Sequence, residues 1–233
     1  MEPDNPLLDD FVLSLSRRHP ARVCFIPTAS ADSASYIVSF YRVFSGRCVP
    51  TDLTLFDSPL LQRRPAQSSE LAAFVAEQDV IYVGGGSTAN LLAVWRAHRL
   101  DVALRDAWSR GMVLSGVSAG MLCWFSGGVT DSYGGLERLN DGLGLIEAAA
   151  CPHYGDDGGR RRAFHRTVAE GSGGGYAADD GAALHFAGTT LAEAVSSRPE
   201  ANAYRVEQIE GRVVETRLPV RFLGQGAAAV KHG

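Results

Sequence analysis

Short apolar runs of strand-forming residues alternate with helical patterns through the first two thirds of this 233-residue chain. The segments that carry such a run are 21–29, 48–56, 79–100 and 103–125. Between the first two, Tyr36, Phe40 and Phe44 share one helical face, and a further helix is expected near 70–77. This alternation is typical of βα units, so we predict an α/β fold with a mostly parallel sheet. In such a sheet, ligands bind where strands end and helices begin.

The pattern changes after Asp180. Alternating segments separated by turns at Gly188 and Gly211 predict antiparallel hairpins. We expect these strands to extend the sheet or cover its edge, within a single domain of residues 1–233. Residues 169–177 are expected to form a flexible loop, and residues 224–233 a flexible tail.

Composition narrows the function classes. The net charge of −4 argues against a nucleic-acid or anionic-membrane surface, so a small molecule or peptide is the expected partner. The four cysteines lack CxxC spacing, which predicts free thiols in a cytoplasmic protein. The first 20 residues place acids before a short apolar segment and bases after it, the wrong order for a secretory signal. An amphipathic helix carrying Leu8, Phe11 and Val12 is expected there instead, and no apolar run approaches the roughly 18 residues of a membrane span.

Ser118 lies in "GVSAG", between an apolar strand and an apolar helical pattern. A nucleophile at the apex of a strand-turn-helix crossing is forced into a strained conformation and needs small neighbours, which Gly116, Ala119 and Gly120 provide. The motif therefore predicts a nucleophile elbow with Ser118 as the nucleophile. A serine N-cap flanked by glycines for close packing is the structural alternative.

The triplet Gly84 to Gly86 ends a second apolar strand and precedes a helix. Backbone amides at such a position can approach a ligand closely. An oxyanion hole made by the amides of Gly86 and Ala119 fits this position. The triplet lacks the patterns of phosphate and dinucleotide loops, and a purely structural turn is the alternative.

A serine hydroxyl needs a base to take its proton, and the chain offers six histidines. They are His19, His98, His153, His165, His185 and His232. His153 follows a short strand and a proline, at a loop start where its side chain could face the crevice. We expect surface or structural positions for the others.

Five motifs occur together in order: "YVGGGSTANLL", "GVSAGM", "VTDS", "CPHY" and "ADDGAAL". Their order and approximate spacing resemble the peptidase E family of serine peptidases, which includes cyanophycinase, from about Val23 to Arg205. This resemblance implies a doubly wound sheet similar to the class I glutamine amidotransferase architecture, with serine in place of the usual cysteine. It also implies that Ser118 is the nucleophile and His153 the general base.

The third member of the triad has three candidates. Asp180 matches the position where relatives place an acid, often glutamate, that orients the histidine. Asp131 in "VTDS" matches another acid of the family pattern, and Asp179 adjoins Asp180. The distance from the carboxylate to the imidazole decides among them.

The resemblance to peptidase E implies a dipeptidase of narrow specificity, which cleaves dipeptides beginning with aspartate. Burial of the substrate carboxylate requires a cation, and the resemblance implies Arg160, from the run 160–162, in this role. Asp156 or Asp157 could bind the free amino group. The segment from "GVSAG" to "VTDS" is closer to less characterised relatives, so a different peptide specificity is an alternative. Relatives commonly begin with a glycine-ending strand before the first helix, so either a core strand is missing here or the true start lies upstream.

Other function classes fit less well. A noncatalytic small-molecule binding protein need not keep Ser118, His153 and an acid together. An amidotransferase-type hydrolase would carry cysteine at position 118, and an esterase would carry its acid before its histidine. We expect no metal and no cofactor, because no histidine pair has ligand spacing and the mechanism requires none. A monomer and a homodimer are both compatible with the sequence.

Overall fold

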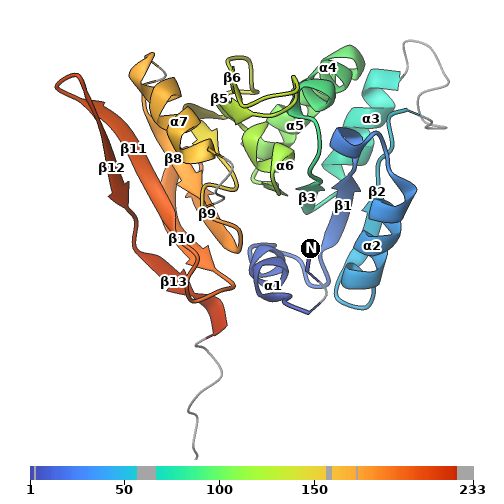
Figure 1. Cartoon of the computed structure of the whole chain (residues 1–233). Helices are drawn as coiled ribbons and strands as arrows, with labels where there is room; N and C mark the ends of the chain where they lie inside the picture. Colours follow the sequence, from blue (N-terminus) through green and yellow to red (C-terminus); the bar gives the residue numbers. More distant parts are fainter. Residues whose placement is uncertain (3, 57–66, 156–158, 172, 225–233) are drawn as a thin grey trace, which may run out of the picture.

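A computed structural model describes residues 1–2, 4–56, 67–155, 159–171 and 173–224, and its first half alternates strands with helices (Figure 1). These elements are α1 (Leu7–Ser14), β1 (Arg22–Ile26), η1 (Thr28–Ser30), α2 (Ala34–Phe44), β2 (Val49–Asp52), α3 (Gln67–Ala76), β3 (Val80–Val83), α4 (Thr88–His98), α5 (Leu100–Ser109) and β4 (Val113–Gly116). The alternation read from the sequence is therefore confirmed.

The first four strands form a parallel sheet in the order β2-β1-β3-β4. Its two faces are covered by different helices. Cys24 and Ile26 pack in a core with residues of α3, α4 and α5, whereas Val23 and Phe25 pack with Phe40 of α2 and residues of α1. Both faces of β1 are buried, which is why it reads as a continuous apolar run.

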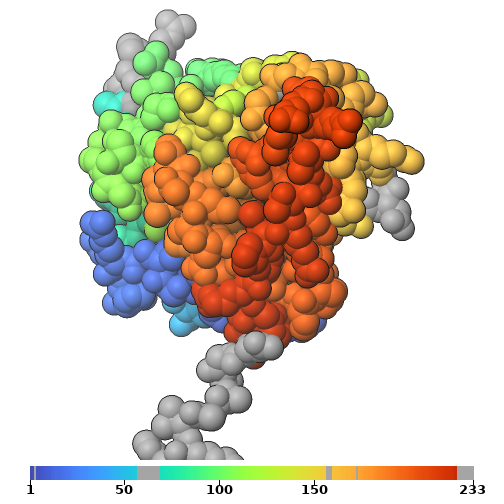
Figure 2. Space-filling view, turned by 90° about the vertical axis from the view of Figure 1, so that its left-hand side faces the viewer, coloured from blue at the N-terminus to red at the C-terminus, as the bar shows by residue number. Residues whose placement is uncertain are grey.

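The second half of the chain begins with a short helix and continues mainly as strands. These elements are α6 (Ala119–Leu122), β5 (Phe125–Thr130), β6 (Glu137–Leu139), β7 (Ile146–Cys151), α7 (Arg160–Ala169), β8 (Gly175–Ala178), β9 (Ala182–Ala187), β10 (Thr190–Ser196), β11 (Ala203–Ile209), β12 (Arg212–Arg217) and β13 (Val220–Phe222). Within the described residues, one sheet has the order β12-β11-β8-β7-β5-β6 and another the order β13-β10-β9. The C-terminal strands, orange to red, spread over one face of the molecule (Figure 2).

Parallel and antiparallel pairs share the larger sheet, as the sequence predicted. Strands β5, β7 and β8 pair in parallel, and β8 with β11 and β11 with β12 are antiparallel. The predicted turns are also present, because Gly188 joins β9 to β10 and Gly211 joins β11 to β12, both with positive φ. The fold is mixed α/β with a mostly parallel core and additional antiparallel strands.

The helix expected after Ser118 is much shorter than its apolar pattern indicated. Helix α6 spans only Ala119–Leu122, and the chain then enters β5 at Phe125. Strand β5 pairs with β7 on one side and β6 on the other, so pairing within the sheet outweighs the local helical pattern. Of the tail predicted at 224–233, all but Gly224 lies outside the described residues.

Two further predictions can be compared with the structure. The amphipathic first helix is present as α1, and all four cysteines are buried free thiols. Among the described helices, none combines the length and the apolar character that crossing a bilayer requires.

Candidate active site

Ser118 stands at the sharp turn between β4 and α6. Its backbone has φ 55° and ψ −114°, which residues other than glycine rarely adopt, so the turn is strained. The neighbouring glycines leave no room for side chains. A Cβ at Gly116 would lie 2.3 Å from the Gly120 carbonyl oxygen, and a Cβ at Gly120 would lie 2.3 Å from that of Val83. This close packing holds Ser118 at the ends of β3 and β4.

The glycine triplet after β3 passes beside Ser118. A Cβ on Gly85 would lie 3.2 Å from the Ser118 Cβ, and the Gly85 amide donates to the Tyr36 hydroxyl over 3.2 Å. Burial raises the pKa of Tyr36, so this hydroxyl stays protonated. Gly86 has φ 138°, and a Cβ there would lie 2.1 Å from the Ala29 carbonyl oxygen. Glycine is therefore required for the triplet to come this close to its neighbours.

The amides of Gly86 and Ala119 belong to the two turns that meet at Ser118. Within the described part of the chain, neither amide has a hydrogen-bond acceptor. Unpaired amides at adjoining turns are suited to an anionic oxygen. The geometry is thus compatible with the oxyanion-hole prediction for these two residues.

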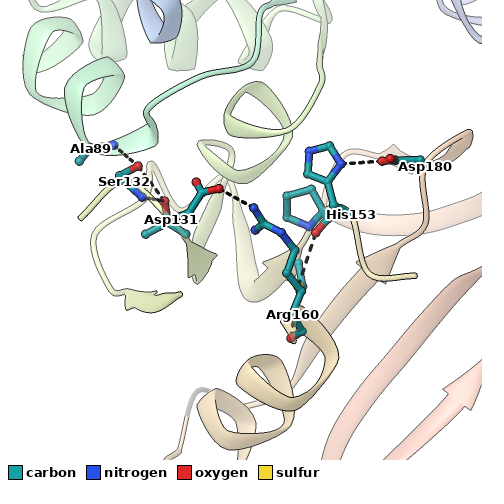
Figure 3. Close-up of polar contacts among 9 residues, drawn as sticks. Ala89, Asp131, Ser132, His153, Arg160 and Asp180 are labelled. Carbon is teal, nitrogen blue, oxygen red and sulfur yellow. Dashed lines mark hydrogen bonds and ion pairs between the residues drawn. The ribbon is translucent and has the colours of Figure 1, made fainter. Parts of the chain in front are cut away.

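His153 lies in the connection between β7 and α7, with φ 56°. Its Nδ1 lies 2.5 Å from Oδ1 of Asp180, which follows β8 (Figure 3). An ionised carboxylate can only accept, so in this contact Nδ1 carries the proton and donates a hydrogen bond to Asp180. Nε2 is then left as an acceptor.

The other two candidate acids have different partners. Asp131 lies 2.7 Å from Nη2 of Arg160 (Figure 3). Asp179 Oδ2 accepts the amide of Asn202 over 3.0 Å. Of the three carboxylates proposed from the sequence, the structure brings Asp180 to the imidazole.

Arg160 begins α7 and is largely buried, with 11% of its side chain exposed. The next arginine has a different partner. Arg161 pairs with Glu215 at 3.6 Å, on another side of the helix. Figure 3 shows the Arg160 side chain pointing from α7 toward Asp131. Its positive charge is thus already compensated by one carboxylate. Asp156 and Asp157, considered for the substrate amino group, lie outside the described residues.

A cavity of about 990 Å³ lies beside the Ser118 turn and the His153–Asp180 contact. Ser118, His153, Asp179 and Asp180 line it, together with apolar side chains of α1, β4 and β9. Gly86, Ala119, Asp131 and Arg160 do not line it. No hydrogen bond joins Ser118 to His153 within the described residues, and contacts of this kind often tighten only when substrate is bound. Among the same residues, no cluster of three or more acids, histidines or cysteines could hold a metal ion.

Two contacts that shape the site were not predicted from the sequence. One is the hydroxyl of Tyr36 on the Gly85 amide, for which the sequence gives only an aromatic helix face. The other is Ser132, whose hydroxyl accepts the Ala89 amide over 3.3 Å (Figure 3). The same hydroxyl lies 2.8 Å from that of Thr130. The bond from the Ala89 amide to Ser132 ties "VTDS" to the start of α4. The serine of that motif was the feature of the sequence that could have indicated it.

Comparison with known proteins gives matches along most of the chain. The model of peptidase family S51 matches residues 1–194. The uncharacterized peptidase YgaJ of Bacillus subtilis (strain 168) is 50% identical over 226 residues, which cover 96% of this chain and 94% of that protein.

Two solved structures share the fold at 18% sequence identity. A peptidase from an acI-B1 Actinobacterium matches with a TM-score of 0.65, covering 92% of this chain and 89% of that one. A Listeria monocytogenes EGD-e protein assigned to peptidase E matches with a TM-score of 0.55, covering 90% of this chain and 93% of that one. These structures agree with the architecture described above.

Proposed function

Because the chain belongs to peptidase family S51 and is a serine-type peptidase, we propose that it hydrolyses short peptides with a triad of Ser118, His153 and Asp180. The observation that carries the proposal is the 2.5 Å contact between His153 and Asp180 in a cavity that Ser118 also lines. An orienting carboxylate keeps the imidazole proton on Nδ1 and stabilises the imidazolium that forms. Nε2 is thereby available to take the serine proton.

The conformation of Ser118 supports its role as nucleophile. A positive φ at the apex of a strand-to-helix turn is the strain expected of a nucleophile elbow. Strain of this kind persists only where the surroundings enforce it, as Gly116 and Gly120 do here. An N-cap serine would have no need of this conformation, and the Ser118 side chain makes no capping hydrogen bond to α6.

In the proposed reaction, Ser118 Oγ attacks the scissile carbonyl carbon while His153 Nε2 takes the hydroxyl proton. The amides of Gly86 and Ala119 donate to the oxyanion. The C–N bond then breaks, and the imidazolium gives its proton to the leaving amine. Water attacks the resulting ester with His153 again as base, which releases the acid and restores Ser118.

The proposed substrates are dipeptides with N-terminal aspartate, recognised by Arg160. A guanidinium has five N–H donors. Among the described residues, Asp131 is the one acceptor bonded to them, at Nη2, which leaves other donors for a second carboxylate. Arg160 is largely buried, and a substrate carboxylate taken out of water needs such a partner. This assignment makes Arg160 the residue that determines specificity.

A serine peptidase with another peptide preference is the second candidate, and the Arg160–Asp131 ion pair favours it. Because Asp131 compensates the guanidinium, the net attraction for an acidic side chain is reduced. In that case Arg160 and Asp131 support the loop after β5, and small or neutral N-terminal residues are accepted.

Hydrolysis of a dipeptide panel tests both candidates. The panel contains Asp-Leu, Glu-Leu, Asn-Leu, Ala-Leu and N-acetyl-Asp-Leu. The proteins, purified in parallel, are wild type, Ser118→Ala and Ser39→Ala, a matched control that removes an exposed serine hydroxyl on α2. Cleavage of Asp-Leu that is lost only in Ser118→Ala supports the triad and the acidic preference together. Cleavage of Ala-Leu at a similar rate supports the second candidate. Activity that survives in Ser118→Ala refutes the nucleophile assignment.

A further inference from the structure

Tyr154, directly after His153 in the chain, points into the core while His153 lines the cavity. Its side chain is 1% exposed and packs against Phe164 of α7, with ring centroids 6.0 Å apart. The phenol oxygen lies 2.5 Å from Oε2 of Glu215 on β12 and 3.0 Å from Nε2 of His165. A buried tyrosine hydroxyl requires such partners.

The backbone of Tyr154 makes a second link. Its amide donates to the Ala178 carbonyl over 3.0 Å, at the end of β8. Asp180, the partner of His153, lies two residues further along the same segment. The main chain of Tyr154 therefore fixes the spacing between the His153 loop and the Asp180 loop, and its side chain fixes the same loop to β12.

Glu215 is held as a carboxylate at this point. Burial alone would raise its pKa, but hydrogen bonds with Tyr154 and His165 and the nearby charge of Arg161 lower the pKa overall. Arg161 also lies over the Tyr154 ring, 4.8 Å from its centroid. The hydrogen bond from Tyr154 to Glu215 is therefore charge-assisted, and such bonds are stronger than neutral ones. Aromatic rings and the Arg161 guanidinium surround it.

His153 itself needs this support, because its φ of 56° is uncommon for a residue with a side chain. Glu215 is also 21 positions beyond residue 194, where the match to the family model ends. We propose that Tyr154 is a positioning residue for His153, and that Glu215 of the β11–β12 hairpin holds it in place. This inference rests on the proposed function, since it assigns the purpose of the contact to alignment of the general base.

The test compares Tyr154→Phe, Glu215→Gln and Glu215→Leu with wild type. A fluorophosphonate reports on the serine: Ser118 Oγ forms a bond to phosphorus, fluoride leaves, and His153 takes the proton. We expect Tyr154→Phe to slow labelling and to lower kcat on a cleaved dipeptide by about 10- to 100-fold, with KM little changed, because misplaced groups lose rate rather than binding. Glu215→Gln keeps an acceptor for the phenol and should retain more activity than Glu215→Leu.

Two controls make the same chemical changes elsewhere. Tyr41→Phe removes a hydroxyl that donates to Asp52 over 2.8 Å between α2 and β2, and Glu207→Gln removes a carboxylate paired with Arg205 on the same C-terminal hairpin. Both should keep wild-type kcat. A kcat of Tyr154→Phe within about twofold of wild type would overturn the proposal, and so would equal losses in the control variants.

An NMR measurement that needs no substrate tests the positioning role even if wild type is inactive or a variant does not fold. The proton on His153 Nδ1 should give a downfield NMR resonance in wild type that broadens or disappears in Tyr154→Phe and Glu215→Leu but persists in Tyr41→Phe. If wild type is neither labelled nor active, the proposed function fails, and this resonance alone decides the positioning role. If Tyr154→Phe does not fold, Glu215→Leu decides it.

Discussion

Arg160 and Asp131 form an ion pair in which one side chain is buried and the other is exposed. Nη2 and Oδ2 are 2.7 Å apart, with 11% of the Arg160 side chain and 59% of the Asp131 side chain accessible to solvent. Asp131 therefore compensates the charge of the buried Arg160 from the side that faces solvent. Removal of Asp131 would leave a positive charge that another anion could neutralise.

Asp131→Asn should strengthen the preference for acidic N-terminal residues. Without the competing carboxylate, Arg160 attracts a substrate carboxylate more strongly, and kcat/KM for Asp-Leu relative to Ala-Leu should rise about two- to fivefold, the range of a solvent-screened pair. The matched control is Asp141→Asn, which removes an exposed carboxylate paired with Arg96 at 2.7 Å. An unchanged ratio would mean that Arg160 does not contact the substrate side chain.

Asp180→Asn should lower kcat by about 10³- to 10⁴-fold with little change in KM, because an amide at this position permits the wrong imidazole tautomer. Asp179→Asn, which changes the neighbouring carboxylate, should keep most of kcat, since Asp179 binds the Asn202 amide instead. Steady-state kinetics on a cleaved dipeptide measures both. Equal losses in the two variants would contradict the assignment of Asp180.

Gly120→Ala should destabilise the fold by about 2 to 4 kcal/mol, because its Cβ would lie 2.3 Å from the Val83 carbonyl oxygen in tightly packed backbone. Gly135→Ala is the control, since a Cβ at Gly135 would have no neighbouring heavy atom within 4 Å and the residue has no positive φ. Urea unfolding of both variants measures the difference. Similar midpoints for the two would show that the packing of the β4–α6 turn against the end of β3 can relax.

Stability should fall as the pH rises above about 9. Burial raises the pKa of Cys24 to about 12, from an ordinary value of 9.0, and burial also raises that of Cys151 to about 12. Above pH 9 these thiols ionise in the unfolded chain but not in the folded one, so the folded state binds more protons and each thiol costs about 1.4 kcal/mol per pH unit. The loss continues up to about pH 12.

Urea unfolding at pH 8, 9, 10 and 11 checks this dependence. Cys24→Ala should flatten the decline above pH 9, whatever its effect on the midpoint at pH 8. An identical slope in wild type and variant would show that Cys24 ionises with equal ease in both states.

The parallel sheet was predictable because β1 and β3 are buried on both faces and read as unbroken apolar runs. The position of Ser118 was predictable for a related reason, since only small residues fit the turn around it. In both cases a local constraint leaves a direct trace in the residue types. The length of α6 was not predictable, because β5 is paired on one side with β7, a strand more than 20 residues away.

The choice of acid illustrates the same limit within the site. Asp131, Asp179 and Asp180 all lie at strand ends, so the sequence left them as alternatives. Asp180 reaches His153 across 27 residues, while the buried Arg160 accounts for Asp131. The Tyr154–Glu215 contact spans 61 residues, and although Tyr154 ends the motif "CPHY", Glu215 lies in none of the five motifs. Such pairings depend on how β8, β11 and β12 are ordered in the sheet.

The parts of the proposed site are distributed from Tyr36, which holds the glycine turn, to Glu215 near the other end of the chain. During synthesis, Ser118 therefore leaves the ribosome well before the residues that align its base. On the proposed mechanism, a nascent chain carries its nucleophile without a working peptidase. With Tyr154 and Glu215 in their proposed roles, the full rate of hydrolysis is reached once the β11–β12 hairpin has been translated and has folded onto the rest.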